Sequence, residues 1–236
     1  EEGFFTDLSI NPVYAAPWAV FVIAATYTSM SEPSGASQVL IDNFIADPLH
    51  PGFGSSLFET VWNAIGVIAL PYACLVMPGA KGQKLNPVPF LFLSSFAGYG
   101  SMGFFMSTRT PQPSIDKDDL GWFTKNVLEN KIFNWALVAF FASAYWSSGA
   151  AVDLLTHPIG TLQEFKDMIS GSALGTATTV DFLILCMTGA SLIPEDLKRR
   201  GFDDDRKVKL IAASTLLVPA LGLTVYSALR PSLDEE

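Results

Sequence analysis

Long runs of apolar residues alternate with shorter polar connections along this 236-residue chain. Six of these runs each approach the roughly 20 residues that an α-helix needs to cross a hydrocarbon core of about 30 Å. The runs cover residues 13–30, 56–77, 87–106, 132–151, 173–193 and 209–229. The pattern predicts an all-α integral membrane protein with about six transmembrane helices. The number falls to five if the first run, which contains Pro17 and is polar from Thr26 onward, is only interfacial.

Two polar connections carry the pattern of a short amphipathic helix on the membrane surface. In one of them, Thr161 and Glu164 have the spacing of a capping box at a helix start. The apolar stripe that follows consists of Leu162, Phe165, Met168 and Ile169. A shorter stripe covers residues 39–45. We expect one or two surface helices, resting against lipid or against a partner protein.

The chain divides into three parts on this pattern. Residues 1–47 form an N-terminal segment with a possible first span, residues 48–231 a multi-helix membrane domain, and residues 232–236 an acidic tail. The first residues, Glu1-Glu2-Gly3-Phe4-Phe5, do not resemble a signal or transit peptide and lack an initiating Met. We therefore expect that a presequence has been removed, as for import into an organelle.

The basic residues predict an orientation. If all six runs cross, ten of the fourteen Lys and Arg residues share one side of the membrane, and four lie on the other. Those four are Lys81, Lys84, Lys166 and Arg230. The positive-inside rule then assigns the side with ten charges to the cytoplasm or stroma, and both termini to the lumen.

Composition excludes several classes of function. Half of the residues are apolar, 16% are charged, and the formal net charge is −9, so a nucleic-acid binder is not expected. Cys74 and Cys186 lie within apolar runs and form no CxxC or haem-attachment motif, so we expect no disulfide. The only two histidines, His50 and His157, lie in connections, where they cannot supply paired axial haem ligands or a diiron site. No hydrolase, zinc-protease or Walker motif is present, and we expect no enzymatic activity.

Asp181 is the acidic residue closest to the middle of a run, where an ionised carboxylate is costly. It could be an ion or proton site if a second polar group faced it, and Asn63 and Asn134 are the candidates. The alternative, which we favour, is a protonated or hydrogen-bonded carboxyl that ties two helices together.

Aromatic residues make up 12% of the chain, with 18 Phe, and could contact ring-containing pigments as well as lipid. A magnesium tetrapyrrole needs one axial donor, which an imidazole, carboxylate or amide can supply. Five such residues lie near the predicted membrane boundaries: His50, Glu59, Asn63, His157 and Gln163. Each also has a structural interpretation, and Glu59 in particular ends a capping-box pattern that begins at Ser56. We expect no metal site beyond such magnesium ligation, and we expect structural lipids.

Several short blocks resemble a family of uncharacterised multi-span membrane proteins of cyanobacteria and chloroplasts. The blocks are 49–53, 58–63, 86–90, 180–182, 195–201, 218–222 and 229–231. The resemblance covers about residues 48–231 and leaves out the first 47 residues. The family provides no catalytic residues to transfer, and it implies the chloroplast thylakoid as the location.

This resemblance leads to a hypothesis about function. We expect an accessory or linker subunit of a thylakoid photosystem and light-harvesting supercomplex, with photosystem I favoured, that contacts core and antenna subunits and holds a few chlorophylls or carotenoids. The chain does not resemble a light-harvesting antenna, because the exchanged Glu and Arg of that family have no counterpart here. The alternatives are a small transporter or carrier centred on Asp181 and a transient photosystem assembly factor.

Overall fold

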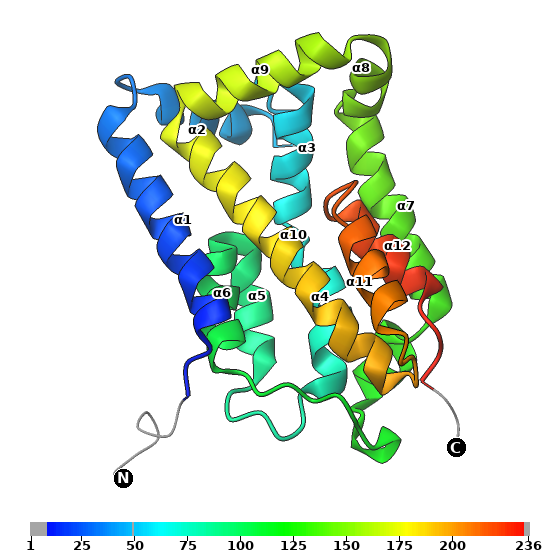
Figure 1. Ribbon diagram of the computed structural model, residues 1–236. Coiled ribbons are helices and arrows are strands. Elements are labelled where there is room, and N and C mark those ends of the chain that lie inside the picture. Colours follow the sequence, from blue (N-terminus) through cyan, green and yellow to red (C-terminus); the bar gives the residue numbers. More distant parts are fainter. Residues whose placement is uncertain (1–8, 49, 234–236) are drawn as a thin grey trace.

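The computed structural model describes residues 9–48 and 50–233, and these residues form helices and no strand (Figure 1). The expectations about the first residues and about most of the acidic tail lie outside the described residues. The longer helices are α1 (Pro12–Ser31), α2 (Ala36–Ala46), α3 (Ser56–Ile65), α4 (Ala69–Val76), α5 (Pro87–Ala97), α6 (Tyr99–Thr108), α7 (Lys131–Ser147), α8 (Ala150–Thr156), α9 (Pro158–Gly171), α10 (Ala173–Arg199), α11 (Asp205–Ser214) and α12 (Leu221–Leu229). Three short helical turns complete the list: η1 (Met77–Gly79), η2 (Lys117–Asp119) and η3 (Thr124–Leu128).

Two described helices, α1 and α10, are long and apolar enough to cross a membrane. Two further crossings are possible if each of two bent pairs counts as one span. Helix α3 continues into α4 and η1 with a bend of 46°, and α7 continues into α8 with a bend of 61°. The membrane character predicted from hydropathy is therefore supported, whereas six transmembrane helices are not confirmed.

The third predicted span is a helical hairpin. Helix α5 ends at Gly98, whose φ of 49° and ψ of −130° reverse the chain, and α6 returns beside α5. Ser101 Oγ donates a hydrogen bond to the carbonyl of Phe90, and the rings of Phe90 and Phe104 stack with centroids 5.8 Å apart. Phe90 and Phe104 would be about 20 Å apart in one continuous helix. The two proline residues at the start of α5 cause no kink because they lie in its first turn.

The sixth predicted span is also a hairpin. Helix α11 begins six residues after α10 ends, and the residue after α12, Arg230, forms an ion pair with Asp196 in the last turns of α10. The start of α11 and the end of α12 therefore lie at the same end of the molecule. The turn between them is tight, because a Cβ added at Gly222 would lie 2.1 Å from the carbonyl oxygen of Thr215. Pro219 lies in this turn and not inside a helix.

Charge is distributed unequally between the two ends of the bundle. We call the end formed by residues 77–87, 109–130, 200–205 and 230–233 the basic end, and the end formed by residues 32–55 and 148–172 the acidic end. Thirteen of the fourteen Lys and Arg residues lie at the basic end or in the adjoining helix turns, and Lys166 of α9 is the exception.

Both described ends of the chain lie at this basic end, which corrects the predicted orientation. The backbone N–H of Asn11 donates to the carbonyl of Ser107, and Arg230 contacts Asp196. Lys81 pairs with Asp119, so the connection around Lys81 also lies here and not on the opposite side. The error arose because each hairpin was counted as a crossing.

The two surface helices predicted from amphipathic stripes are present at the acidic end as α2 and α9 (Figure 1). The capping boxes were not predicted correctly. Helix α9 begins at Pro158, so Thr161 lies within its first turns and its hydroxyl donates to the carbonyl of His157. Helix α3 is capped by Ser55, whose Oγ accepts from the N–H of Phe58, and not by Ser56.

Glu32 joins three helices at this end. Its carboxylate accepts hydrogen bonds from the backbone N–H and the hydroxyl of Ser37 in α2, and from the N–H of Ala173 at the start of α10. The Ser37 bonds hold the pKa of Glu32 below its ordinary value. The carboxylate thus satisfies N–H groups that have no partner within their own helices.

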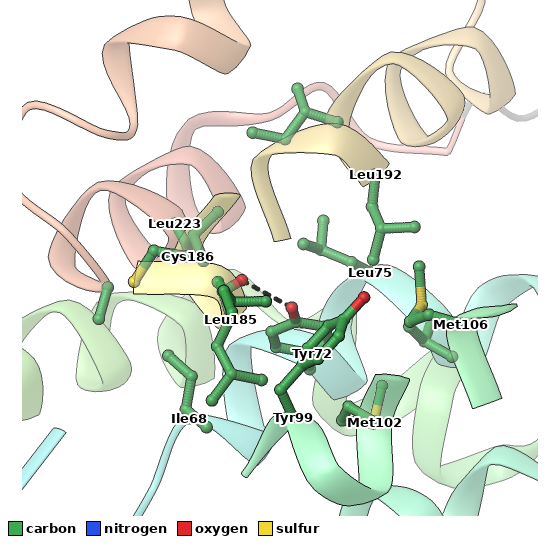
Figure 2. Packing of buried hydrophobic residues seen from close by; sticks show 14 of the residues in the cluster. Ile68, Tyr72, Leu75, Tyr99, Met102, Met106, Leu185, Cys186, Leu192 and Leu223 are labelled. Carbon is green, nitrogen blue, oxygen red and sulfur yellow. Dashed lines mark hydrogen bonds between the residues drawn. The ribbon is translucent and has the colours of Figure 1, made fainter. Parts of the chain in front are cut away.

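The core lies where α4, α6 and α10 meet (Figure 2). Tyr72 is fully buried there, and its hydroxyl donates to the carbonyl of Leu185 at 2.6 Å. Met102 and Met106 of α6 are also completely buried in this cluster. Hairpin α5–α6 is therefore part of the main core and not a peripheral insertion.

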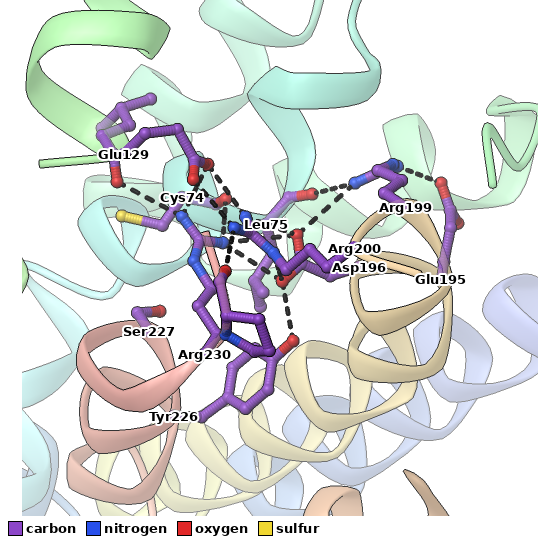
Figure 3. A network of polar contacts seen from close by, with 12 residues as sticks. Cys74, Leu75, Glu129, Glu195, Asp196, Arg199, Arg200, Tyr226, Ser227 and Arg230 are labelled. Carbon is purple, nitrogen blue, oxygen red and sulfur yellow. Dashed lines mark hydrogen bonds and ion pairs between the residues drawn. The ribbon is translucent and has the colours of Figure 1, made fainter. Parts of the chain in front are cut away.

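A buried network of charged side chains holds the basic end together (Figure 3). Asp196 is 0% exposed and accepts hydrogen bonds from Arg200, Arg230 and Tyr226. Glu129, beside η3, bridges the same two arginines at 2.8 to 3.0 Å. The network joins the end of α10 to α12 and to the segment before α7.

A second group of ion pairs extends the network along α10. Glu195 is held by both terminal nitrogens of Arg109, at 2.6 and 2.8 Å, and also pairs with Arg199. Arg199 also donates to the carbonyl of Leu75, and Arg230 donates to the carbonyl of Cys74. Both carbonyls lie near the end of α4, where helix carbonyls need partners. The two hairpins are thereby anchored at one end.

The hairpins predict which connections share a side of the membrane. With Cys74 and Cys186 buried, single cysteines placed at Lys84 and Ser114 should react with a membrane-impermeant maleimide from one side, and cysteines at Ser34 and His157 from the other. Labelling in sealed vesicles, repeated after permeabilisation as the control for accessibility, measures this. Six crossings would instead place Ser34 with Ser114, and that result would contradict the hairpin topology.

Candidate functional site

The break between α5 and α6 brings a carboxylate into the interior of the bundle. The N–H of Tyr99, the first residue of α6, donates to Asp181 Oδ1 at 2.6 Å, and Asp181 is 6% exposed. A negative charge or acceptor at a helix N-terminus is favourable because it accepts hydrogen bonds from the N–H groups that have no partner within the helix, and because it interacts with the helix dipole. Asp181 therefore ties α10 to α6, as the favoured sequence interpretation proposed.

Gly98 allows this contact in two ways. It can adopt the positive φ of the break, which is rare for residues with a side chain. Its lack of a side chain also leaves room for the carboxylate, because a Cβ at this position would lie 1.6 Å from Asp181 Oδ2. Gly103 of α6 has a related role, since its Cβ would lie 2.6 Å from the Tyr99 ring and 2.7 Å from Trp18.

Helix α1 is attached to the same hairpin by two hydrogen bonds. The Tyr99 hydroxyl donates to the carbonyl of Tyr14 at 2.8 Å, and Trp18 Nε1 donates to the carbonyl of Gly100 at 3.2 Å. The phenol of Tyr14 also contacts Ser191 of α10 at 3.1 Å. The tip of hairpin α5–α6 is therefore held between α1 and α10.

A cavity of about 620 Å³ adjoins this tip. It is bounded by the end of α5 with Gly98, by one face of α10 with Asp181, and by residues of α1, α2 and α3. Its aromatic lining consists of Phe21, Phe44, Trp62 and Phe96, and its hydroxyl groups come from Ser94, Ser95 and Thr178. This combination of an apolar wall with a few polar groups is typical of small-molecule sites of 300–1,000 Å³.

The wall of the cavity nearest the acidic end is an aromatic cluster. Trp62 lies 5.3 Å from both Phe44 and Phe53 between ring centroids, in edge-to-face arrangements, and 6.3 Å from Phe58. Such pairs contribute about 0.5–1.5 kcal/mol beyond area burial. The cluster therefore holds the indole of Trp62 in a fixed position at the cavity.

The cavity offers few polar groups for a ligand. Ser94 Oγ already donates to the carbonyl of Leu91 at 2.7 Å, and Asp181 Oδ1 accepts from Tyr99. Asp181 Oδ2 and the hydroxyls of Ser95 and Thr178 are the cavity-lining groups suited to a polar substituent or to an axial position of a tetrapyrrole. The remaining contacts with an occupant would be aromatic and aliphatic.

Two of the predicted pigment ligands, His50 and Glu59, come together. His50 Nδ1 lies 3.8 Å from Glu59 Oε1, and the imidazole is exposed whereas Glu59 is buried. The Glu59 carboxylate also accepts from the N–H of Gly52. These contacts hold the connection 50–53 against the start of α3.

The other predicted ligands are dispersed. His157 and Gln163 are exposed at the acidic end, where His157 contacts Thr156 and Gln163 donates to Asp167. Asn63 is partly buried in α3, and neither it nor any of the other four predicted ligands lines the cavity at Asp181.

Asn134, one of the two candidates for a polar group facing Asp181, has its hydrogen bonds elsewhere. Its amide donates to the carbonyls of Leu128 and Asn130 at the start of α7, and its oxygen accepts from Cys74. The residues that sequence analysis missed are the aromatic residues of the wall and Gly98. A local signal for the break is present in residues 98–100, where two glycines flank Tyr99.

The described residues contain no group of three or more His, Cys, Asp or Glu side chains arranged to hold a metal ion. Comparison with protein-family models, with curated proteins and with solved structures finds no match to this chain. The site must therefore be interpreted from its own geometry.

A methyl group at Gly98 should disrupt the helix break. In Gly98→Ala, the new Cβ would displace Asp181 and a non-glycine residue would occupy a strained backbone region, so we expect a loss of at least about 2 kcal/mol of stability. Thermal unfolding of the purified protein in detergent measures this. Gly100→Ala is the matched control, because its Cβ would meet only Ala97 at 4.0 Å and should be tolerated. Equal stability of the two variants would contradict the proposed role of Gly98.

Proposed function

We propose that this chain is an accessory membrane subunit of a thylakoid photosystem and antenna supercomplex, with photosystem I favoured, and that it holds a ring-containing pigment, chlorophyll or carotenoid, in the cavity beside Asp181. The observation that carries the proposal is the cavity of about 620 Å³ with four aromatic side chains in its wall. Planar or polyene pigments present large apolar faces, which such a wall accommodates.

The outer surface of the bundle supports a role in a larger membrane assembly. Helix α1 has no buried residue, and large apolar side chains project from α1, α5 and α7. Among those more than 45% exposed are Val20, Ile23, Phe92, Phe96, Trp135 and Trp146. These surfaces suit lipid tails or neighbouring subunits. The positive-inside rule favours the stroma for the basic end.

The proposal predicts that the chain migrates together with a photosystem and with pigment. After mild solubilisation of thylakoids, the chain should run with a photosystem band on a native gel, and the band should contain photosystem core or antenna subunits and pigment absorption. A chain released alone and colourless would contradict the proposal. A chain found only with photosystem intermediates, whose deletion lowers photosystem accumulation, would identify a transient assembly factor instead.

A substitution that fills the cavity tests pigment binding separately from assembly of the chain into a supercomplex. Ala177 of α10 lines the cavity, so Ala177→Phe should lower the pigment content of the purified chain, measured by absorption after extraction. Ala213→Phe on the exposed side of α11 is the matched control and should retain pigment. Unchanged pigment content in Ala177→Phe would exclude this cavity as the binding site.

A carrier centred on Asp181 is the second candidate, favoured by the broken helix whose N-terminus meets a carboxylate in the interior. In Asp181→Asn, an amide oxygen can still accept from Tyr99, so the fold should persist while the ionisable group is lost. If the chain is a carrier, proton or sodium flux into proteoliposomes should be present in the unmodified chain, absent in Asp181→Asn and retained in Asp167→Asn, which changes an exposed residue of α9. The subunit proposal expects no flux in any of the three.

A further inference from the structure

A second large cavity lies at the basic end, remote from Asp181. It measures about 880 Å³, is open to the surface, and is bordered by the connection 113–118, by the end of α10, and by Gly201 and Leu233. Four cationic side chains contribute to its wall: Lys117, Lys198, Arg199 and Arg200. Asp116 and Asp118 also border it, but both residues are exposed to solvent.

Lys117 has no partner for its charge within the described residues. Its Nζ is buried from solvent, and no acceptor lies within hydrogen-bond distance. Burying an ammonium group without an acceptor is costly, and such groups are normally paired. Lys198, by contrast, is exposed at the same cavity.

The neighbouring ion network cannot supply the missing negative charge. It combines four arginines and Lys131 with only three carboxylates. The carboxylates are Glu129, Glu195 and Asp196. Each of them is already held by at least two cations, and Lys131 donates to the carbonyls of Ala228 and Arg230. Among the described residues, the four cationic side chains of the cavity wall outnumber its two carboxylates, Asp116 and Asp118.

The nitrogen atoms of Arg199 and Arg200 are occupied by protein acceptors. Arg199 donates to Gln112, Leu75 and Glu195, and Arg200 donates to Asp196, Glu129 and the carbonyl of Pro231. These two residues contribute a positive field, whereas Lys117 and Lys198 have donors for a ligand. Lysine binds phosphate oxygens as a compact point charge.

We propose that this cavity binds a phosphate group, with the ammonium groups of Lys117 and Lys198 as donors. The phosphate can belong to the headgroup of an anionic lipid or to a free phosphate ion, since both present the same oxygens to the lysines. The position at the basic end of a membrane bundle is where cavities with basic walls bind lipid headgroups.

Thermal unfolding in detergent tests the proposal with two probes, inorganic phosphate and short-chain phosphatidylglycerol, against phosphatidylcholine as the zwitterionic reference. A ligand at about 100 times its Kd should raise the Tm of the unmodified chain by at least about 5 °C. Lys117→Gln should lose most of this shift. Lys125→Gln is the matched control, because it removes an exposed lysine of η3 outside the cavity and should keep the shift.

The two probes distinguish the sources of the phosphate. A shift with phosphatidylglycerol alone identifies a lipid headgroup, and a shift with inorganic phosphate as well identifies a site for the free ion. No shift with either probe, or an equal shift in Lys117→Gln and the unmodified chain, would overturn the proposal. Without added anion, Lys117→Gln should unfold at the same Tm as the unmodified chain or at a higher one, since the substitution removes an unpaired ammonium. A lower Tm would show that Lys117 has a purely structural role, and this result would also overturn the proposal.

Discussion

The buried carboxylate of Asp196 is the interaction on which the arrangement of helices depends most. It lies near the end of α10 and accepts from Arg200, the residue that follows α10, and from Tyr226 and Arg230 at the end of the second hairpin. Removing one member of a buried ion pair costs about 3–5 kcal/mol, because the partner charges remain buried without compensation. The two hairpins can enter the bundle from one end because this end is fixed.

Anchoring the hairpins at the basic end places their tips in the interior, where backbone groups need partners. Asp181 accepts from the first N–H of α6, and the hydroxyl of Tyr145 donates to the carbonyl of Pro219 in the turn before α12. Interruption of a helix away from water is tolerated only where such groups are satisfied. These contacts at the two breaks explain some of the polar residues within the apolar runs, and no catalytic role needs to be assumed for them.

Hydropathy predicted the apolar segments, the surface helices and the all-α class, because these depend on local composition. It could not separate a crossing from a hairpin, since residues 87–106 have the same mean apolar character in either form. The ion network could not be predicted from the sequence for a different reason. The tertiary structure brings Arg109, Glu129 and Arg230 to α10 from distant parts of the sequence. A local signal did exist in Glu195-Asp196 and Arg199-Arg200, whose spacing of four residues allows ion pairs on one helix.

The hairpin also accounts for the position of the cavity at Asp181. Helix α5 has 11 residues and a length of about 16 Å, roughly half of a hydrocarbon core of about 30 Å. Beyond the tip at Gly98, the space between α1, α3 and α10 is not filled by a continuing helix, and the cavity begins there. Small residues such as Ala177 and Gly66 border this space and do not fill it. An occupant with an apolar body, as we propose, would therefore take the place of the missing half of a span.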